Sequence, residues 1–179
     1  MTSFFKVINR SETPVSPWVR LVAKEVRSSE KEQTHVYHSL AVADYVVVIA
    51  MTSSGLIPVV SQFRPAVEAI TWELPAGLRD GEESPEETCR RELKEETGLD
   101  AVKITALASW FTDTGRLENR LHVFFAETGD CLPSAGSEEG IRVQFVKPET
   151  LLSWIQEGKF ALSMHIAAFL FWHFRNRSR

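Results

Sequence analysis

The chain has 179 residues, of which 44% are hydrophobic and 25% charged, and its formal net charge is −4. This length and composition are ordinary for one globular domain with a buried core. The acidic balance argues against a general nucleic-acid binder, which normally has a basic surface. It also sets a condition for any phosphate-handling enzyme, because an acidic site attracts a polyanion only where metal ions invert the local charge.

Cysteine usage and apolar runs indicate the compartment. The two cysteines, Cys89 and Cys131, form no C-x-x-C pair, and Cys89 falls inside a predicted helix. We therefore expect no structural disulfide and a reducing compartment. The first ten residues lack a long apolar run, so no secretory signal is expected. The most apolar stretch, residues 160–174, is about 15 residues long, short of the roughly 20 that span a membrane. These features predict a cytoplasmic protein without membrane contact.

The N-terminal part is typical of β-structure. Short strands at residues 4–8, 18–26 and 35–42 are predicted to form a small antiparallel sheet. Residues 45–51 (YVVVIAM) are a β-branched run typical of a central strand covered on both faces. After a turn signal at Ser53, Ser54 and Gly55, residues 56–63 are predicted to return as its partner strand.

The rest of the chain alternates strands with three helices. The final helix is apolar on nearly every side, which favours core packing over a dimer interface. Its His165 and His173 are interpreted as packed or interfacial histidines rather than zinc ligands, since no cysteine or carboxylate cluster accompanies them. The predicted elements are strands at 66–74, 102–111, 120–127 and 141–146, and helices at 85–97, 148–155 and 160–176.

The helix at 85–97 has strong local signals at both ends. Ser84 supplies a capping hydroxyl, and Pro85 follows at the first helical position, where its missing N–H costs nothing. Glu87, three residues after Ser84, completes a capping box. Gly98 is able to adopt the left-handed conformation that ends a helix.

Three carboxylates share one face of this helix. Glu92, Glu95 and Glu96 fall within roughly 100° of arc at 3.6 residues per turn. Such close carboxylates raise one another's pKa values unless a cation holds them together. One interpretation is a solvated acidic face. The other is a site for a hard cation such as Mg²⁺, which prefers oxygen ligands and would also use the preceding loop at residues 74–77.

The stretch from Gly77 to Leu99 carries nine constrained positions over 23 residues. It resembles the complete Nudix box, and on this motif the chain is identified as a member of that family. The family resemblance implies an α/β/α sandwich with a mixed sheet, here with the small antiparallel sheet added. We expect a single Nudix domain over residues 1–179, with an N-terminal sheet at about 1–42 and the core at about 43–179. The matching residues are Gly77, Glu83, Arg91, Glu92, Leu93, Glu95, Glu96, Gly98 and Leu99.

The flanks of the box indicate a branch of the family. Gln62-Phe63-Arg64-Pro65 and Trp72-Glu73-Leu74-Pro75-Ala76-Gly77 resemble the ADP-ribose and nucleoside-diphosphate-sugar pyrophosphatases. The resemblance implies that Arg64 grips a phosphate and that Glu73 contacts the substrate. Arginine suits that task because its planar fork meets phosphate oxygens in pairs. The alternative for Arg64 is a surface residue at a strand end.

Thinner resemblances extend to both ends of the chain. Trp18 and Tyr37 resemble two aromatic residues that sandwich the base, and in related dimers such segments reach the partner's site. A homodimer is thus implied by resemblance only, and core packing stays open for either ring. Glu139 resembles the loop residue that acts as general base in this branch, and the match favours it over Glu138. The alternative is that both residues belong to a solvated acidic loop.

One departure concerns the loop after the box. Thr114-Gly115 stands where the ADP-ribose enzymes usually have Pro-Gly, near the terminal sugar. This departure does not affect the expected diphosphate chemistry. It leaves open which sugar the substrate carries. Glu118 in the same loop is a candidate substrate contact.

The implied activity is metal-dependent hydrolysis of ADP-ribose or another nucleoside diphosphate sugar to a nucleoside monophosphate and a sugar phosphate. The implied cofactor is Mg²⁺, with Mn²⁺ as a substitute. Its ligands would be Glu92, Glu96 and the Ala76 carbonyl, with Glu95 at a second ion or as a substitute base. Arg91 would orient the box carboxylates. The alternatives are a Nudix hydrolase of triphosphates, dinucleoside polyphosphates or coenzymes, and a non-catalytic ADP-ribose sensor.

Overall fold

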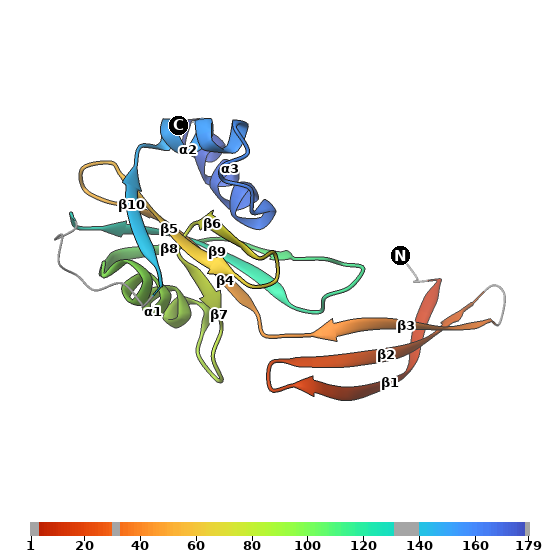
Figure 1. Ribbon diagram of the computed structural model, residues 1–179. Helices are drawn as coiled ribbons and strands as arrows, with labels where there is room; N and C mark the ends of the chain where they lie inside the picture. Colours follow the sequence, from red (N-terminus) through yellow and green to blue (C-terminus); the bar gives the residue numbers. More distant parts are fainter. Residues whose placement is uncertain (1–3, 30–32, 131–139, 178–179) are drawn as a thin grey trace. The chain divides into compact units, whose positions relative to one another are not determined.

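The computed structural model describes residues 4–29, 33–130 and 140–177 (Figure 1). The chain divides into two compact units. The first contains the residues up to Ala43 together with Phe111–Arg120, and the second contains Asp44–Trp110 and Leu121–Arg179. The sequence predicts that the N-terminal sheet ends near residue 42. The structure adds residues 111–120 to that unit. Within the described residues, no helix is long and apolar enough to cross a membrane.

The first unit is the predicted antiparallel sheet, in the order β1(Phe5–Ser16), β2(Val19–Ser28), β3(Thr34–Ala41). β1 extends eight residues beyond the predicted end at residue 8, because its antiparallel partner β2 satisfies the backbone of its polar second half. The 111–120 loop is joined to β3 by backbone hydrogen bonds, from Leu40 N to Arg116 O and from Glu118 N to Leu40 O. Nearly all of β1 is exposed, so this sheet buries few apolar side chains of its own.

The second unit contains two sheets. One has the order β7-β4-β9-β8 and the other β10-β5-β6. β4 pairs antiparallel with β7 and parallel with β9, so the first sheet is mixed, as predicted. The elements are β4(Tyr45–Met51), β5(Ile57–Arg64), β6(Ala69–Glu73), β7(Ala76–Leu78), α1(Pro85–Thr97), β8(Ala101–Phe111), β9(Arg120–Thr128), β10(Arg142–Val146), α2(Pro148–Gln156) and α3(Ser163–Arg177).

One predicted pairing is wrong. The sequence predicts that residues 56–63 pair with the central strand, but β5 pairs with β6 and β10. A strand has two edges, and those of β4 are occupied by β7 and β9. The turn after β4 therefore carries the chain into the second sheet. Two boundaries also differ: β6 begins at Ala69 after a turn, and α3 begins at Ser163, because the N–H of Phe160 bonds to Trp154 O at the end of α2.

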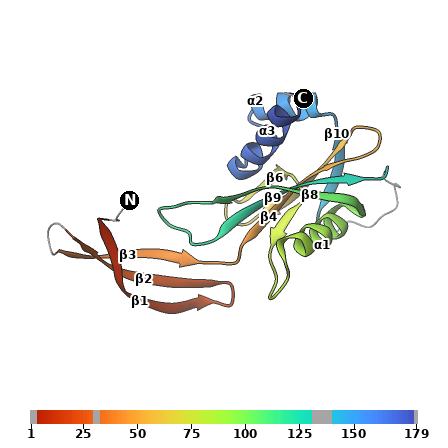
Figure 2. The same cartoon turned by 180° about the vertical axis from the view of Figure 1, so that it is seen from behind.

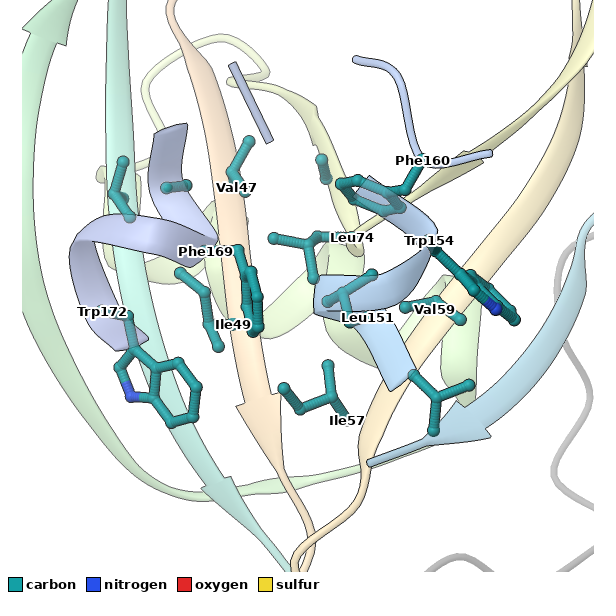
Figure 3. Close-up of a cluster of buried hydrophobic side chains, with 14 of the residues drawn as sticks. Val47, Ile49, Ile57, Val59, Leu74, Leu151, Trp154, Phe160, Phe169 and Trp172 are labelled. Atoms are coloured by element: carbon teal, nitrogen blue, oxygen red, sulfur yellow. The ribbon is translucent and has the colours of Figure 1, made fainter. Parts of the chain in front are cut away.

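Helices cover both faces of the central strand, in agreement with its β-branched sequence. α1 and the α2–α3 pair lie on opposite sides of β4 (Figures 1 and 2). Because side chains alternate along a strand, Val46 and Val48 join Cys89 and Leu93 of α1 in one cluster. Val47 and Ile49 lie in the other cluster, with residues of α2 and α3 (Figure 3).

Phe169 is central to this second cluster. It is fully buried, and Figure 3 shows its ring beside Ile49 and Leu74. The favoured interpretation of the final helix as core is confirmed for this face, although Phe171 and Phe174 are exposed on the same helix.

The core role of Phe169 is testable by truncation. We expect Phe169→Ala to lower the free energy of unfolding by about 3–5 kcal/mol, because the lost burial adds to the cost of a cavity. Phe174→Ala, at a side chain 60% exposed on the same helix, is the control and should change stability far less. Urea denaturation of both variants measures the difference, and equal losses would contradict the packing described.

Candidate active site

The carboxylate-bearing helix forms as its sequence predicts. α1 spans Pro85–Thr97, with the complete capping box between Ser84 and Glu87 and Pro85 in its first turn. Gly98 ends it at φ 72°, and its N–H donates to Lys94 O. Cys89 and Leu93 anchor the helix on β4, which fixes the direction in which the box carboxylates point. Burial raises the pKa of the Cys89 thiol to about 12, so this free cysteine is packed and unreactive.

Arg91 is the centre of the site, and five N–H groups of its guanidinium make hydrogen bonds. Nε and Nη2 donate to the two oxygens of Glu83, at 2.9 and 3.1 Å. Nη1 donates to Glu92 at 2.7 Å and to Glu95 at 3.0 Å. The fifth bond runs from Nη2 to Leu78 O at 3.1 Å. Arg91 therefore brings three of the predicted carboxylates together and ties the helix to the strand before it.

Glu83 takes part as an ionised partner of Arg91. The Arg91 hydrogen bonds lower the pKa of Glu83 to about 2, and bonds from Thr88 and the Asp80 N–H act in the same direction. Glu95, by contrast, keeps half of its side chain exposed. The four box glutamates thus lie in different surroundings on one helix and its preceding loop.

Glu96 is buried against the preceding loop. Its Oε2 accepts a hydrogen bond of 2.9 Å from the Ala76 N–H, and the side chain is 3% exposed. Burial, together with the neighbouring charges of Glu92 and Glu73, raises the pKa of Glu96 to about 8, although the bond from the Ala76 N–H acts to lower it. The surroundings of Glu96 therefore disfavour its ionised form, and a nearby positive charge would stabilise that form.

Gly77 makes room for Glu92. A Cβ at this glycine would lie 1.9 Å from Glu92 Oε1 and 2.1 Å from its carboxyl carbon. A side chain at position 77 would therefore displace the Glu92 carboxylate from the position it occupies beside the backbone of β7. The backbone at Gly77 and the Glu92 carboxylate therefore lie next to each other.

These residues fit a hard divalent cation in their donor chemistry. Glu92 and Glu96 offer carboxylate oxygens beside the loop backbone, and the raised pKa of Glu96 marks a place where a cation would be favoured. Within residues 4–29, 33–130 and 140–177, however, no three His, Cys, Asp or Glu side chains are already placed to hold a metal together. Arg91 and the Ala76 N–H engage the carboxylates instead. The predicted ligands Ala76, Glu92, Glu95 and Glu96 stay a prediction.

Arg64 and Glu73 form a two-point ion pair. Arg64 Nε and Nη2 donate to the two Glu73 oxygens at 2.7 and 2.6 Å, and Thr71 donates to Glu73 at 2.5 Å. Burial acts to raise the pKa of Glu73, but the bonds from Arg64 and Thr71 outweigh it and lower the pKa. Arg64 itself remains partly exposed, so the pair presents a guanidinium to solvent with a buried carboxylate behind it.

The remaining predicted contacts lie in the first unit or outside the described residues. Trp18 is 71% and Tyr37 56% exposed, so neither ring is packed in a core. Glu118 is held by Arg10, Lys24 and Ser39. Burial acts to raise the Glu118 pKa, but these partners lower it to about 2. Glu138 and Glu139 lie outside the described residues.

The sequence interpretation missed one hydrogen-bonded pairing next to the site. His165 is fully buried, and its Nδ1 accepts a 3.0 Å hydrogen bond from the Leu74 N–H. Its Nε2 lies 3.5 Å from the Tyr45 hydroxyl. Leu74 and His165 are 91 residues apart, so no local signal joins them. His165 thus supports the strand end that carries Glu73.

The site lies on a capped helix whose carboxylates are held by an arginine. This helix packs on a mixed sheet that has helices on both faces. The site therefore belongs to the α/β proteins, and its acidic side chains offer the donors that a metal ion needs. The NUDIX domain matches residues 40–165 of the chain. The chain belongs to the Nudix family.

Relatives and a solved structure agree with this assignment. An ADP-ribose pyrophosphatase of Bacillus subtilis (strain 168) is 44% identical over 82 residues, which are 46% of this chain and 44% of that protein. One from Mycobacterium tuberculosis is 40% identical over 82 residues, 45% of this chain and 40% of that protein. A methanol dehydrogenase activator of Bacillus methanolicus is 37% identical over 82 residues, 46% of this chain and 44% of that protein. The matches span less than half the length of these relatives.

The solved structure supports the fold over nearly the whole chain. A crystal structure of an ADP compounds hydrolase superposes with a TM-score of 0.81 and covers 98% of this chain and 96% of its own, at 15% identity. The predicted Nudix α/β fold with its mixed sheet is confirmed.

The buried His165 predicts an acid-labile fold. Burial lowers its pKa to about 4, below the ordinary value of 6.5. As the pH falls from about 6.5 to about 4, the unfolded chain binds a proton that the folded chain excludes, so stability falls. The expected loss from this residue is roughly 3 kcal/mol.

Urea denaturation at pH 7 and at pH 4 tests this. In His165→Asn the loss on acidification should be smaller by that amount, whereas His35→Asn, at an exposed histidine, should keep it. If the free energy of unfolding of His165→Asn fell between pH 7 and pH 4 by as much as that of the unaltered protein, the lowered pKa of His165 would be refuted.

Proposed function

We propose that the protein is a metal-dependent hydrolase of the diphosphate linkage in ADP-ribose or another nucleoside diphosphate sugar. The products are a nucleoside monophosphate and a sugar phosphate. The observation that carries the proposal is the Arg91 network, which gathers box carboxylates beside the buried Glu96. The relatives named ADP-ribose pyrophosphatase support the substrate class.

Mg²⁺ is the proposed cofactor, with Mn²⁺ as a substitute. Glu92, Glu96 and the Ala76 carbonyl would hold it, and Glu95 would serve a second ion. A bound divalent cation supplies charge neutralisation for the diphosphate and a lower pKa for the attacking water. The raised pKa of Glu96 supports this assignment, because a cation there would favour the ionised carboxylate.

The chain's own residues have distinct proposed roles. Arg91 orients the box carboxylates, a role that its hydrogen bonds to Glu92 and Glu95 support. Arg64 grips a phosphate of the substrate, while Glu73 fixes the guanidinium and lies beside the bound ligand. Glu139 accepts the proton of the attacking water, with Glu95 as the substitute base.

The first unit is proposed to bind the base and a second copy of the chain. Trp18 and Tyr37 would stack on the two faces of the base, and their exposure supports a binding role over a core role. Glu118 is a weaker candidate for substrate contact, since three partners already engage it. Exposed Phe5, Val15 and other apolar residues of the sheet support a homodimer in which a partner covers them. A cytoplasmic location is proposed from the free, buried Cys89.

A panel of nucleotide sugars with and without Mg²⁺ tests the proposal. Turnover should require the cation, and Glu96→Gln should lower kcat by roughly 10²-fold or more, because it removes a ligand charge while keeping the shape. Glu86→Gln, on the exposed face of the same helix, is the matched control and should retain full activity. Full turnover in EDTA, or a fully active Glu96→Gln variant, would remove the metal mechanism.

The base assignment has its own pair of variants. Glu139→Gln should lower kcat by about 10²- to 10⁴-fold, the usual range for a general base, with little change in KM. Glu138→Gln is the adjacent control and should have a much smaller effect. A dominant effect at Glu138 would shift the assignment by one residue. Normal rates for both variants beside an inactive Glu95→Gln would move the base onto α1.

A further inference from the structure

The second unit contains a cavity of about 590 Å³ that Arg64 and Glu73 line together with residues that have no proposed role so far. It lies between the β5–β6 hairpin and the connection from α2 to α3. Its size falls within the range of small-molecule sites, roughly 300–1,000 Å³. Its walls are mainly apolar, and they include Tyr45, Arg64, Ile70, Trp72, Lys159 and Leu162.

The Arg64 guanidinium has donors left for a ligand in this cavity. Nε and one Nη2 hydrogen engage Glu73. A guanidinium carries five N–H donors in a fixed fork. Within the described residues Arg64 Nη1 makes no hydrogen bond, so this nitrogen of a cavity-lining residue is available to a phosphate oxygen.

The Tyr45 hydroxyl is held as a donor by His165. Because His165 Nδ1 accepts the Leu74 N–H, the neutral ring carries its proton on Nε2. Nε2 then donates to the Tyr45 oxygen, 3.5 Å away, and the phenol hydrogen remains for another acceptor. Burial raises the pKa of Tyr45 and lowers that of His165, so both groups stay neutral near pH 7.

Lys159 supplies a cation on the cavity wall. Its Nζ lies 3.4 Å from the ring centroid of Trp154 and 5.5 Å from that of Trp72. In the part of the chain that the structure describes, Lys159 forms no ion pair with a carboxylate. The indole faces hold the ammonium in place while its N–H groups can donate to a ligand.

We propose that this cavity binds one half of the diphosphate substrate as an organic phosphate. Its phosphate meets Arg64, and its ring, which bears hydrogen-bond acceptors, meets the Tyr45 hydroxyl and the Lys159 ammonium. The identity of the ligand rests on the proposed function, but the site rests on the cavity and its three donors. Tyr45 and Lys159 thus become residues that determine specificity, and His165 a positioning residue that acts through Tyr45.

Calorimetric binding of AMP and of ribose 5-phosphate, each without metal, tests the cavity and distinguishes the two halves. At least one probe should bind the unaltered protein. Tyr45→Phe and Lys159→Met should each weaken that binding about fivefold or more, because each removes a hydrogen bond to the ligand. Lys103→Met, at an exposed lysine on β8, is the matched control and should bind normally.

Failure of the cavity and failure of the proposed function give different results. No binding of either probe, or normal binding by both Tyr45→Phe and Lys159→Met, would overturn the cavity site even if ADP-ribose is hydrolysed. Binding that both variants weaken, in a protein that hydrolyses no nucleotide sugar, would retain the cavity and refute the activity.

A double-mutant cycle tests the positioning role of His165. His165→Asn should weaken binding of the probe in the unaltered protein but have no further effect in Tyr45→Phe. It should lower the melting temperature in both backgrounds, because the Leu74 N–H loses its partner in each. Equal effects on binding in both backgrounds would show that His165 does not act through Tyr45.

Discussion

The site depends on the way one guanidinium satisfies three carboxylates. Glu83, Glu92 and Glu95 all bond to Arg91, and without it their like charges would repel on one helix and its loop. The planar fork of arginine makes this possible, since an ammonium offers only three donors without fixed directions. The fifth N–H bonds to Leu78 O, so the same side chain also sets the distance between α1 and β7.

This electrostatic arrangement needs a rigid base, which β4 provides. Alternate residues of β4 pack against α1 on one face and against α2 and α3 on the other. Leu93 packs on β4 between Glu92 and the turn that bears Glu96, so the apolar contact also orients the carboxylates. His165 on α3 bonds to Leu74 N, and Ala76 N bonds to Glu96. The segment at residues 74–77, which leads from β6 into β7, is therefore held by a residue of α3 and by a residue of α1.

Local features were predictable from the sequence, and long-range ones were not. The bounds of α1 are confirmed because Ser84, Pro85 and Gly98 act within a few residues of the helix ends. The pairing of β5 was predicted wrongly, because it depends on which strands occupy the edges of β4. Periodicity within a segment does not contain that information.

In the candidate site, too, the local features were predictable from the sequence and the long-range contacts were not. The Nudix motif placed four carboxylates and Arg91 on one helix and its loop, and the structure brings Glu83, Glu92 and Glu95 into contact with Arg91. The bond between His165 and Leu74 joins segments 91 residues apart, so neither segment signals the other. The cavity beside Arg64 arises only when the β5–β6 hairpin meets the α2–α3 connection, and no motif marks it.

The Arg64–Glu73 pair shows how a buried charge serves a binding site. Removing a carboxylate from water is costly, and burial by itself acts to raise the pKa of Glu73. Arg64 and Thr71 keep it ionised, and Glu73 in turn fixes the guanidinium in one orientation. An arginine already ordered in this way loses little conformational entropy when a phosphate binds. Because Glu73 occupies only one edge of the fork, a phosphate would replace water on the exposed edge and leave the ion pair intact.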